Sequence, residues 1–308
     1  MVGVRTPPAT QLRLLNRKGP LCAGQLHLLN PAATRGEGTT YMLYRSLLDD
    51  SKDKSQSKLM VSAGFFANRN NWGSLRLAWS RVLRSHGLKY FKSSEYYRLD
   101  GEFSKFRSAL YPSPSGREGA RQIRDELQFT LEQHPQIFGI AVAILLEDYR
   151  RAVGRPDAAG ILPINPYHTA LNSIIYETVK RVNLLPGKNK VAFLHDDGPD
   201  IGSLVSSYKH FKKYNPRTAK TLAGFGGLDD KDHPELQAAD MIANYAMQRG
   251  LEALQRRQKD LKTTIGELTK NFVMFGYWDE NYILSAIKSI RRERGLSIPV
   301  NLQGEEYD

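Results

Sequence analysis

Cysteine and long apolar runs are both scarce in this chain. The one cysteine in 308 residues, Cys22, excludes an intramolecular disulfide framework and any metal site built from several thiolates. The longest apolar stretch, Ile137 to Leu146, is interrupted by Gly139 and is shorter than the roughly 20 residues that cross a bilayer. We therefore expect no membrane span and a reducing compartment, the cytoplasm.

Three common catalytic signatures are also missing. The chain has no Gly-x-x-x-x-Gly-Lys phosphate loop, no Gly-x-Ser-x-Gly nucleophile turn and no His-Glu-x-x-His zinc motif. Cys22 lies in an N-terminal segment without helical or strand periodicity, so it is a poor candidate for a nucleophile. Any chemistry must come from other residue types, and the acids are the best placed.

Acidic residues are rare at the N-terminus and are outnumbered by basic residues over the chain as a whole. Residues 1–38 contain one acid, Glu37, and no serine, which differs from a serine-rich transit peptide. We expect a disordered tail there. The whole chain has 44 Lys and Arg against 32 Asp and Glu, a formal charge of +12. That excess favours a polyanionic partner, most simply nucleic acid, although basic proteins without such a partner also exist.

Strands and helices alternate over residues 39–250, which predicts one α/β domain. An antiparallel hairpin comes first, and a helical insertion over about 69–134 precedes a buried central strand. Strand–helix alternation then predicts right-handed crossovers and a largely parallel sheet flanked by helices. A C-terminal helical extension over 251–300 and a loose acidic tail over 301–308 complete the prediction. The expected strands are Thr40–Asp50, Leu59–Ala67, Ile137–Glu147, Lys190–Asp196 and Thr221–Phe225, and the expected helices include Asn70–Leu83, Arg117–Gln133, Pro166–Leu184, Ile201–Tyr214, Arg249–Lys262, Leu268–Phe275 and Ile283–Ile290.

One helix, expected from His233 to Met247, is almost entirely apolar. Its polar exceptions, His233, Gln237, Asp240 and Asn244, follow spacings of four, three and four, so they share a face. An ionised Asp on a buried helix is costly unless it is paired or binds a cation. Asp240 is therefore a candidate for chemistry, and the alternative is a cap or an internal ion pair.

Further acids stand at the ends of predicted strands, at Asp49-Asp50 and at Asp196-Asp197. Sites in parallel sheets collect at strand ends. If the first strand is central and the fourth lies beside it, Asp49, Asp196 and Asp240 can meet. Asp50 is a supporting carboxylate, and Asp197 is an alternative to Asp196 because a one-residue shift turns the side chain to the opposite face of the strand.

Three converging carboxylates repel one another, and hard divalent cations resolve that repulsion. Mg²⁺ or Mn²⁺ is the usual solution for oxygen ligands. Two such ions roughly 4 Å apart can activate a water and stabilise the leaving oxygen of a phosphodiester. The sequence thus predicts a metal-dependent nuclease in which Asp49, Asp196 and Asp240 serve as catalytic residues and metal ligands.

The same residues resemble the domain of unknown function 3800 family. The matching segments are Leu48-Asp49-Asp50-Ser51, Val61-Ser62-Ala63-Gly64-Phe65, Phe193-Leu194-His195-Asp196 and Lys231-Asp232-His233-Pro234-Glu235-Leu236-Gln237-Ala238-Ala239-Asp240. The resemblance spans about residues 41–250. It implies a ribonuclease-H-like fold and, through that fold, nuclease or polynucleotidyl-transfer chemistry. Asp50 stands where the family usually has Glu.

Two residues of the closing motif have supporting roles in this interpretation. Lys231 either contacts phosphate or orients a carboxylate, or else it is an exposed loop lysine. Gln237 positions Asp240 or a backbone group. The rival function is a non-catalytic nucleic-acid-binding or assembly protein on the same fold, and a third interpretation is a strand-transferase of a mobile element.

Overall fold

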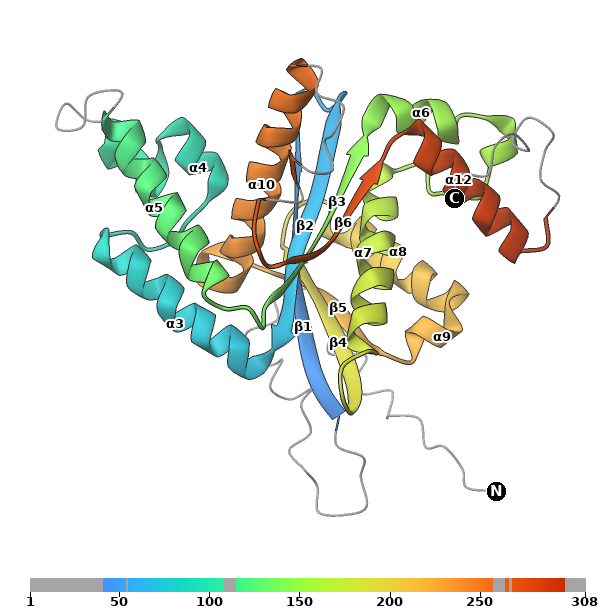
Figure 1. Ribbon diagram of the computed structural model, residues 1–308, viewed down its shortest axis with the longest axis horizontal. Helices are drawn as coiled ribbons and strands as arrows, with labels where there is room; N and C mark the ends of the chain where they lie inside the picture. Colours follow the sequence, from blue (N-terminus) through green and yellow to red (C-terminus); the bar gives the residue numbers. More distant parts are fainter. Residues whose placement is uncertain (1–40, 54, 108–114, 257–263, 266–267, 297–308) are drawn as a thin grey trace, which may run out of the picture.

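A mixed sheet with strand order β5-β4-β1-β2-β3-β6 forms the centre of the molecule (Figure 1). The structure is a computed structural model and describes residues 41–53, 55–107, 115–256, 264–265 and 268–296. The strands are β1 (Tyr41–Lys52), β2 (Leu59–Asn68), β3 (Phe138–Leu145), β4 (Lys188–Asp196), β5 (Leu222–Leu228) and β6 (Phe272–Trp278).

The strand directions confirm the predicted hairpin and the predicted parallel half. β2 runs antiparallel to both β1 and β3, whereas β4 is parallel to β1, β5 to β4 and β6 to β3. β1 is therefore internal, with β2 on one side and β4 on the other. A central first strand beside the fourth is the arrangement that allows the acids at their ends to lie close together.

Close packing in the centre of the sheet requires a glycine. Gly64 on β2 faces Leu48 on β1, and a Cβ at Gly64 would lie 2.2 Å from the carbonyl oxygen of Leu47. β2 is buried along nearly its whole length, as its continuous apolar sequence Leu-Met-Val-Ser-Ala-Gly-Phe-Phe-Ala indicates. Side chains alternate between the two faces, so Leu47 joins one core and Leu48 the other.

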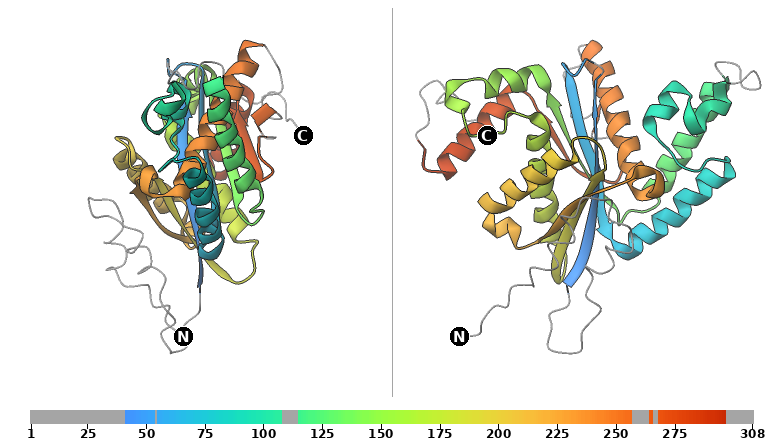
Figure 2. Two further views of the ribbon diagram at one scale, coloured as in Figure 1. Left: turned by 90° about the vertical axis from the view of Figure 1, so that its left-hand side faces the viewer. Right: turned by 180° about the vertical axis from the view of Figure 1, so that it is seen from behind.

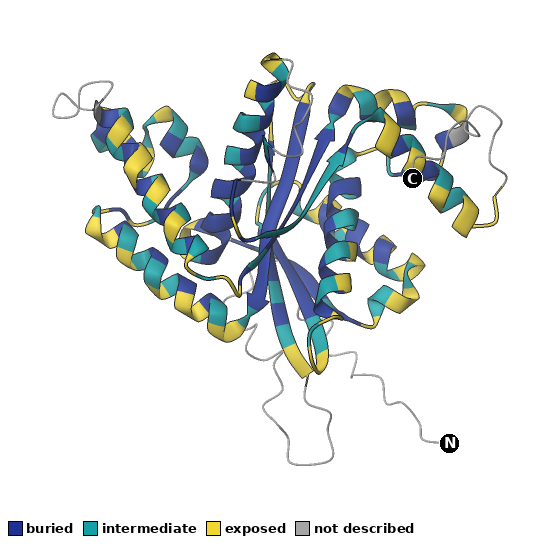
Figure 3. Cartoon of the chain, viewed as in Figure 1, coloured by how far each residue is buried: buried dark blue, intermediate teal, exposed yellow. Residues whose placement is uncertain are grey.

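Helices cover both faces of the sheet, so the described chain has three layers (Figures 1 and 2). The middle of the sheet is buried, β6 and the starts of β1 and β4 are partly exposed, and the outward sides of the helices are exposed (Figure 3). One face carries α3 (Arg69–Ser85), α4 (Ser93–Arg98), η1 (Gly101–Arg107), α5 (Ser115–Glu132) and α10 (Pro234–Gln255). The other carries α6 (Leu146–Val153), α7 (Pro166–Val182), α8 (Ile201–Tyr214) and α12 (Glu280–Glu293), and the short helices η2 (Pro156–Ala158), α9 (Pro216–Ala219) and η3 (Asp230–Asp232) lie in connections.

The predicted helical insertion is present between β2 and β3. Its tryptophans, Trp72 and Trp79, are fully buried, which agrees with a core role rather than base stacking. The Trp72 indole donates to the Arg45 carbonyl at 3.0 Å, which ties α3 to β1. The aromatic residues around Phe91 also pack inward, with the Phe91 and Phe103 rings edge to face at 5.6 Å.

Two expectations were wrong. Leu268–Phe275 was expected to be a helix, but β6 occupies Phe272–Trp278, so the region 251–300 adds a strand to the sheet besides α12. Aromatic and β-branched residues favour a half-buried pleated surface, and Phe-Val-Met-Phe-Gly-Tyr-Trp is such a sequence. The third strand was expected to continue to Glu147, but it ends at Leu145, and Glu147 and Asp148 lie in the first turn of α6.

Other expectations fall on residues that the structure does not describe. These are the tails 1–38 and 301–308 and the second half of the helix expected over Arg249–Lys262, of which α10 contains the part up to Gln255. Within the described ranges, no helix has the length and apolar character to cross a membrane.

Candidate metal centre

Asp49 and Asp50 lie near the end of the central strand β1, beside the end of β4. Leu48 is level with His195 in the parallel pairing, so the acids that follow each of them are neighbours. The strand ends in a turn that Asp53 holds, because its carboxylate accepts backbone N–H groups from Lys58 at 3.0 Å and Leu59 at 3.2 Å. The hairpin thus fixes where the Asp49-Asp50 pair sits.

Asp49, Asp50 and His195 form a group with metal-ligand spacing. One ligand atom from each residue lies within 4.8 Å of the other two, and this is the one such group of three found in the described part of the chain. His195 Nε2 is 2.7 Å from Asp50 Oδ1. His195 Nδ1 donates to the Asp196 carbonyl at 3.1 Å, which aims Nε2 at the carboxylates.

Electrostatics couple these groups strongly. Burial holds the pKa of the Asp49 carboxyl well above its usual range, and the charges of Asp240 and Asp50 raise it further. Burial alone would lower the pKa of His195, but its hydrogen bond with Asp50 prevails and raises that pKa to about 9. The site therefore holds a proton on His195 at neutral pH, and a metal that binds Nε2 must displace it.

A second group of carboxylates surrounds a lysine from the insertion. Lys92 Nζ lies 2.5 Å from Asp230 Oδ2 and 3.8 Å from Asp196 Oδ2. Burial would lower the pKa of Lys92, but its hydrogen bond with Asp230 and the charges of Asp230, Asp196 and Asp240 raise it above the usual value. Burial raises the pKa of Asp230 against the opposing effect of Lys92. Lys92 is therefore a cation fixed among acids.

Asp240 and Gln237 on α10 hold the segment that carries Lys92. The Ser93 backbone N–H donates to Asp240 Oδ2 at 2.6 Å, and the Phe91 N–H donates to Gln237 Oε1 at 3.0 Å. Burial raises the pKa of Asp240 to about 6, although the Ser93 hydrogen bond opposes it. The polar face of α10 predicted from the spacing of Gln237 and Asp240 thus contacts the insertion. Gln237 binds a backbone group there, as predicted.

The structure places the three predicted ligands in two adjoining groups. Asp49 lies with Asp50 and His195, whereas Asp196 and Asp240 lie around Lys92. The groups adjoin, because the charges of both Asp240 and Asp196 act on Asp49.

The two remaining supporting residues lie outside both groups. Asp197 is exposed, and its carboxylate packs beside Gly227, where an added Cβ would lie 2.8 Å from Asp197 Oδ1. Lys231 is exposed and its ammonium lies 5.2 Å from the centre of the Tyr90 ring. Lys231 therefore fits the alternative interpretation as a loop lysine, and the cation beside the carboxylates is Lys92.

Sequence reasoning missed Lys92, Asp230 and the role of His195. Lys92 and Asp230 are separated by 138 residues and both stand in short connections, where no periodicity marks them. His195 could have been found from the sequence, because it directly precedes Asp196 on a strand expected beside the first. The pairing of β4 with β1 then sets His195 level with Leu48. Two other acids, Glu147 and Asp148, share a surface ion-pair group with Arg151.

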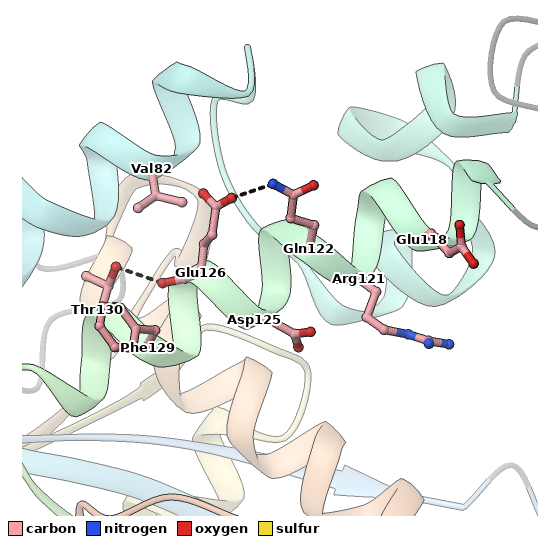
Figure 4. Close-up of a pocket in the computed structure, with 8 residues that line it drawn as sticks. All are labelled: Val82, Glu118, Arg121, Gln122, Asp125, Glu126, Phe129 and Thr130. Carbon is pink, nitrogen blue, oxygen red and sulfur yellow. Dashed lines mark hydrogen bonds between the residues drawn. The ribbon is translucent and has the colours of Figure 1, made fainter.

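A separate surface hollow lies between α3 and α5, and none of these carboxylates lines it (Figure 4). Two of its acids have local partners, since Asp125 pairs with Arg124. Glu126 accepts from Gln122 at 2.9 Å and pairs with His86 at 2.8 Å. The lining of the hollow contains no histidine, and its Thr130 hydroxyl donates to the Glu126 carbonyl at 2.8 Å, so it offers no chemistry comparable to that at the end of β1.

Comparison with known proteins adds nothing to this geometry: no protein-family model matches the chain, and no curated protein matches it. The residues of the site are therefore the only guide to function. Carboxylate oxygens and one imidazole nitrogen within ligand spacing suit a divalent cation. The neighbouring fixed ammonium suits an anionic group bound beside that cation.

Proposed function

We propose that the chain is a divalent-metal-dependent hydrolase of phosphodiester bonds in nucleic acid, on a ribonuclease-H-like fold similar to the domain of unknown function 3800 family. The observation that carries the proposal is the Asp49–Asp50–His195 group, with ligand atoms within 4.8 Å at the end of the central strand. The hairpin followed by parallel strands supports the fold assignment.

The donor set fits a divalent cation, with a preference for Mn²⁺ over Mg²⁺. Two carboxylates suit either ion, whereas a nitrogen donor such as His195 Nε2 suits Mn²⁺ better than Mg²⁺. Such an ion, when bound, lowers the pKa of a coordinated water and offsets charge on phosphoryl oxygens. Asp49 and Asp50 would hold the ion, and His195 would lose its proton to join them.

Lys92 has a separate task beside that centre. Its side chain is 30% exposed, so the ammonium can contact a ligand while it remains paired with Asp230. A fixed positive charge near a phosphodiester orients the phosphate and stabilises the negative charge that develops on its oxygens. Asp240 acts through the backbone of Ser93 and keeps Lys92 in position.

The nucleic-acid partner is supported by the charge of the chain. The formal charge is +12, and residues 201–228 contain no Asp or Glu but five Lys and Arg. A polyanion such as nucleic acid is the simplest binding partner for a chain with this excess of positive charge. The single cysteine agrees with action in the cytoplasm.

The test is a nuclease assay on DNA and RNA with Mn²⁺ or Mg²⁺ titrated in. Asp49→Asn should lower the cleavage rate by about 100-fold or more, because it removes a ligand charge. Asp240→Asn removes the negative charge that acts on Asp49 and Lys92, and it should also remove most activity without unfolding the chain. Asp197→Asn is the matched control at the exposed end of β4 and should cleave at the wild-type rate. Full activity of folded Asp49→Asn would refute the proposed centre.

A non-catalytic nucleic-acid-binding protein is the second candidate. It is favoured by the placement of positive charge, because Lys212, Lys213 and Arg217 on α8 and α9 form no ion pair with a carboxylate among the described residues. These residues lie near the start of β4, away from Asp49. Binding that weakens with salt, ignores chelator and survives Asp49→Asn, with no cleavage in any metal, would support this candidate.

A further inference from the structure

We propose that Lys92 takes the place of a second divalent ion, so that the chain binds one metal ion rather than two. This inference rests on the metal centre proposed above and deepens it. The sequence led to a pair of ions among Asp49, Asp196 and Asp240. The structure instead gives these acids one metal-capable group and one lysine.

The ammonium of Lys92 lies among the acids that would hold a second ion. Lys92 Nζ contacts Asp230 at 2.5 Å and reaches to 3.8 Å from Asp196, and its charge acts on Asp240. Two of these acids, Asp196 and Asp240, adjoin Asp49. A metal ion bound by Asp196 and Asp240 would have to lie close to a fixed positive charge, and the repulsion disfavours it.

Lys92 is held firmly by its chain neighbours and by its partner. The residues on either side of it are fixed to α10, since Phe91 N–H donates to Gln237 and Ser93 N–H donates to Asp240. Asp230 is almost fully buried, with a side chain 3% exposed. If Lys92 moved away, Asp230 would remain buried without its cation, so displacement of the lysine by a metal ion is unfavourable.

The ligand atoms that remain suit a single ion. One oxygen of Asp240 already accepts the Ser93 amide at 2.6 Å, which reduces its availability to a metal. Asp49, Asp50 and His195 keep mutual ligand spacing without Lys92. Asp49, Asp50 and His195 would therefore bind one ion. Lys92 would be the neighbouring positive charge that contacts phosphate.

The experiment is calorimetric Mn²⁺ titration of the full chain, with stoichiometry as the readout. The wild type should bind one ion. Lys92→Met removes the ammonium and should allow a second ion, whereas Lys92→Arg keeps the charge and should still bind one. Lys231→Met is the matched control, an exposed lysine on the neighbouring connection, and should also bind one ion. Circular dichroism confirms that each variant is folded.

Each outcome decides between the proposals. Two ions in the wild type would overturn the role of Lys92 and leave the metal centre standing. One ion in folded Lys92→Met would also overturn it. If Lys92→Met does not fold, the double variant Lys92→Met with Asp230→Asn, which leaves no buried unpaired charge at that pair, replaces it and should bind two ions. No Mn²⁺ bound by the wild type would refute the metal centre and this inference together.

Discussion

At the scale of single residues, Asp53 determines how β1 ends and therefore where Asp49 and Asp50 sit. Its carboxylate accepts backbone N–H groups from Ser57, Lys58 and Leu59 and a hydroxyl from Ser55. Burial alone would raise the pKa of Asp53, but these hydrogen bonds lower it to about 2. The turn thus depends on an ionised carboxylate.

The contribution of Asp53 to stability should depend on pH. Because the folded-state pKa lies below the unfolded value, the stabilisation is present above about pH 4 and is lost as the pH falls toward 2. Asp53→Asn should lower the free energy of unfolding by roughly 1–2 kcal/mol at pH 7. The difference in free energy of unfolding between Asp53→Asn and the wild type should shrink to near zero by about pH 2. Urea unfolding at several pH values measures it.

The control is Asp232→Asn, a neutralised carboxylate on the exposed turn η3. It should match the wild type at every pH, because its side chain is open to solvent. If the loss in free energy of unfolding caused by Asp53→Asn stays constant from pH 7 to 2, the hydrogen-bonded charge is not its cause.

At the scale of elements, the fold depends on how the insertion docks against α10. Gln237 is fully buried and accepts from both the Trp79 indole at 3.1 Å and the Phe91 amide at 3.0 Å. Its own amide donates to the Asp230 carbonyl at 2.9 Å. One side chain therefore joins α3, the Lys92 segment and the connection that carries Asp230.

Gln237→Met preserves volume and removes these hydrogen bonds. We expect a loss of roughly 2–4 kcal/mol in the free energy of unfolding, because two buried N–H donors lose their acceptor. Amide hydrogen exchange at Phe91 and Ser93 should accelerate more than exchange in β2.

Gln248→Met is the matched control, since Gln248 lies on the same helix and is only half-buried. It should change stability by less than about 0.5 kcal/mol. Equal destabilisation by the two substitutions would assign the effect to the helix rather than to the docking contacts.

At the scale of the whole molecule, the acidic site and a group of lysines lie at opposite ends of the parallel strands. Asp49 and Asp196 stand at the ends of β1 and β4, whereas Lys190 stands near the start of β4, about 20 Å away at roughly 3.3 Å per residue. Burial lowers the pKa of Lys190, and the charge of Lys212 lowers it further. Positive charge is thus concentrated around that end.

We predict that this basic end contributes to polyanion binding. Lys212→Glu combined with Lys213→Glu should weaken the binding of a single-stranded oligonucleotide about tenfold or more at low salt, because two phosphate contacts become repulsive. The slope of log K against log salt should become shallower by about 2. Fluorescence anisotropy across a salt series measures both effects.

The control is Arg81→Glu combined with Arg84→Glu, which makes the same change in formal charge on the exposed side of α3. If the two double variants weaken binding equally, net charge is responsible and the end near Lys212 has no special role.

The sequence by itself determined most of the elements and placed the acids at the ends of β1 and β4. Apolar runs set β2 and β3, alternation of strand and helix set the parallel half, and proline together with the polar face marked α10. These are local properties, since periodicity and propensity act over a few residues. For the same reason the sequence alone selects Asp49, Asp50, Asp196 and Asp240 as candidates. It does not predict β6, because an aromatic run of seven residues fits a helix or a strand.

Only the tertiary structure decided which side chains meet. The pairing of Lys92 with Asp230 and that of His195 with Asp50 join segments 138 and 145 residues apart. Such contacts depend on strand register and on the docking of the insertion, and no local pattern encodes them. The acids led to a prediction of two metal ions, and the fold places a lysine among them. The cost of an unpaired buried charge is what links that lysine to its carboxylates.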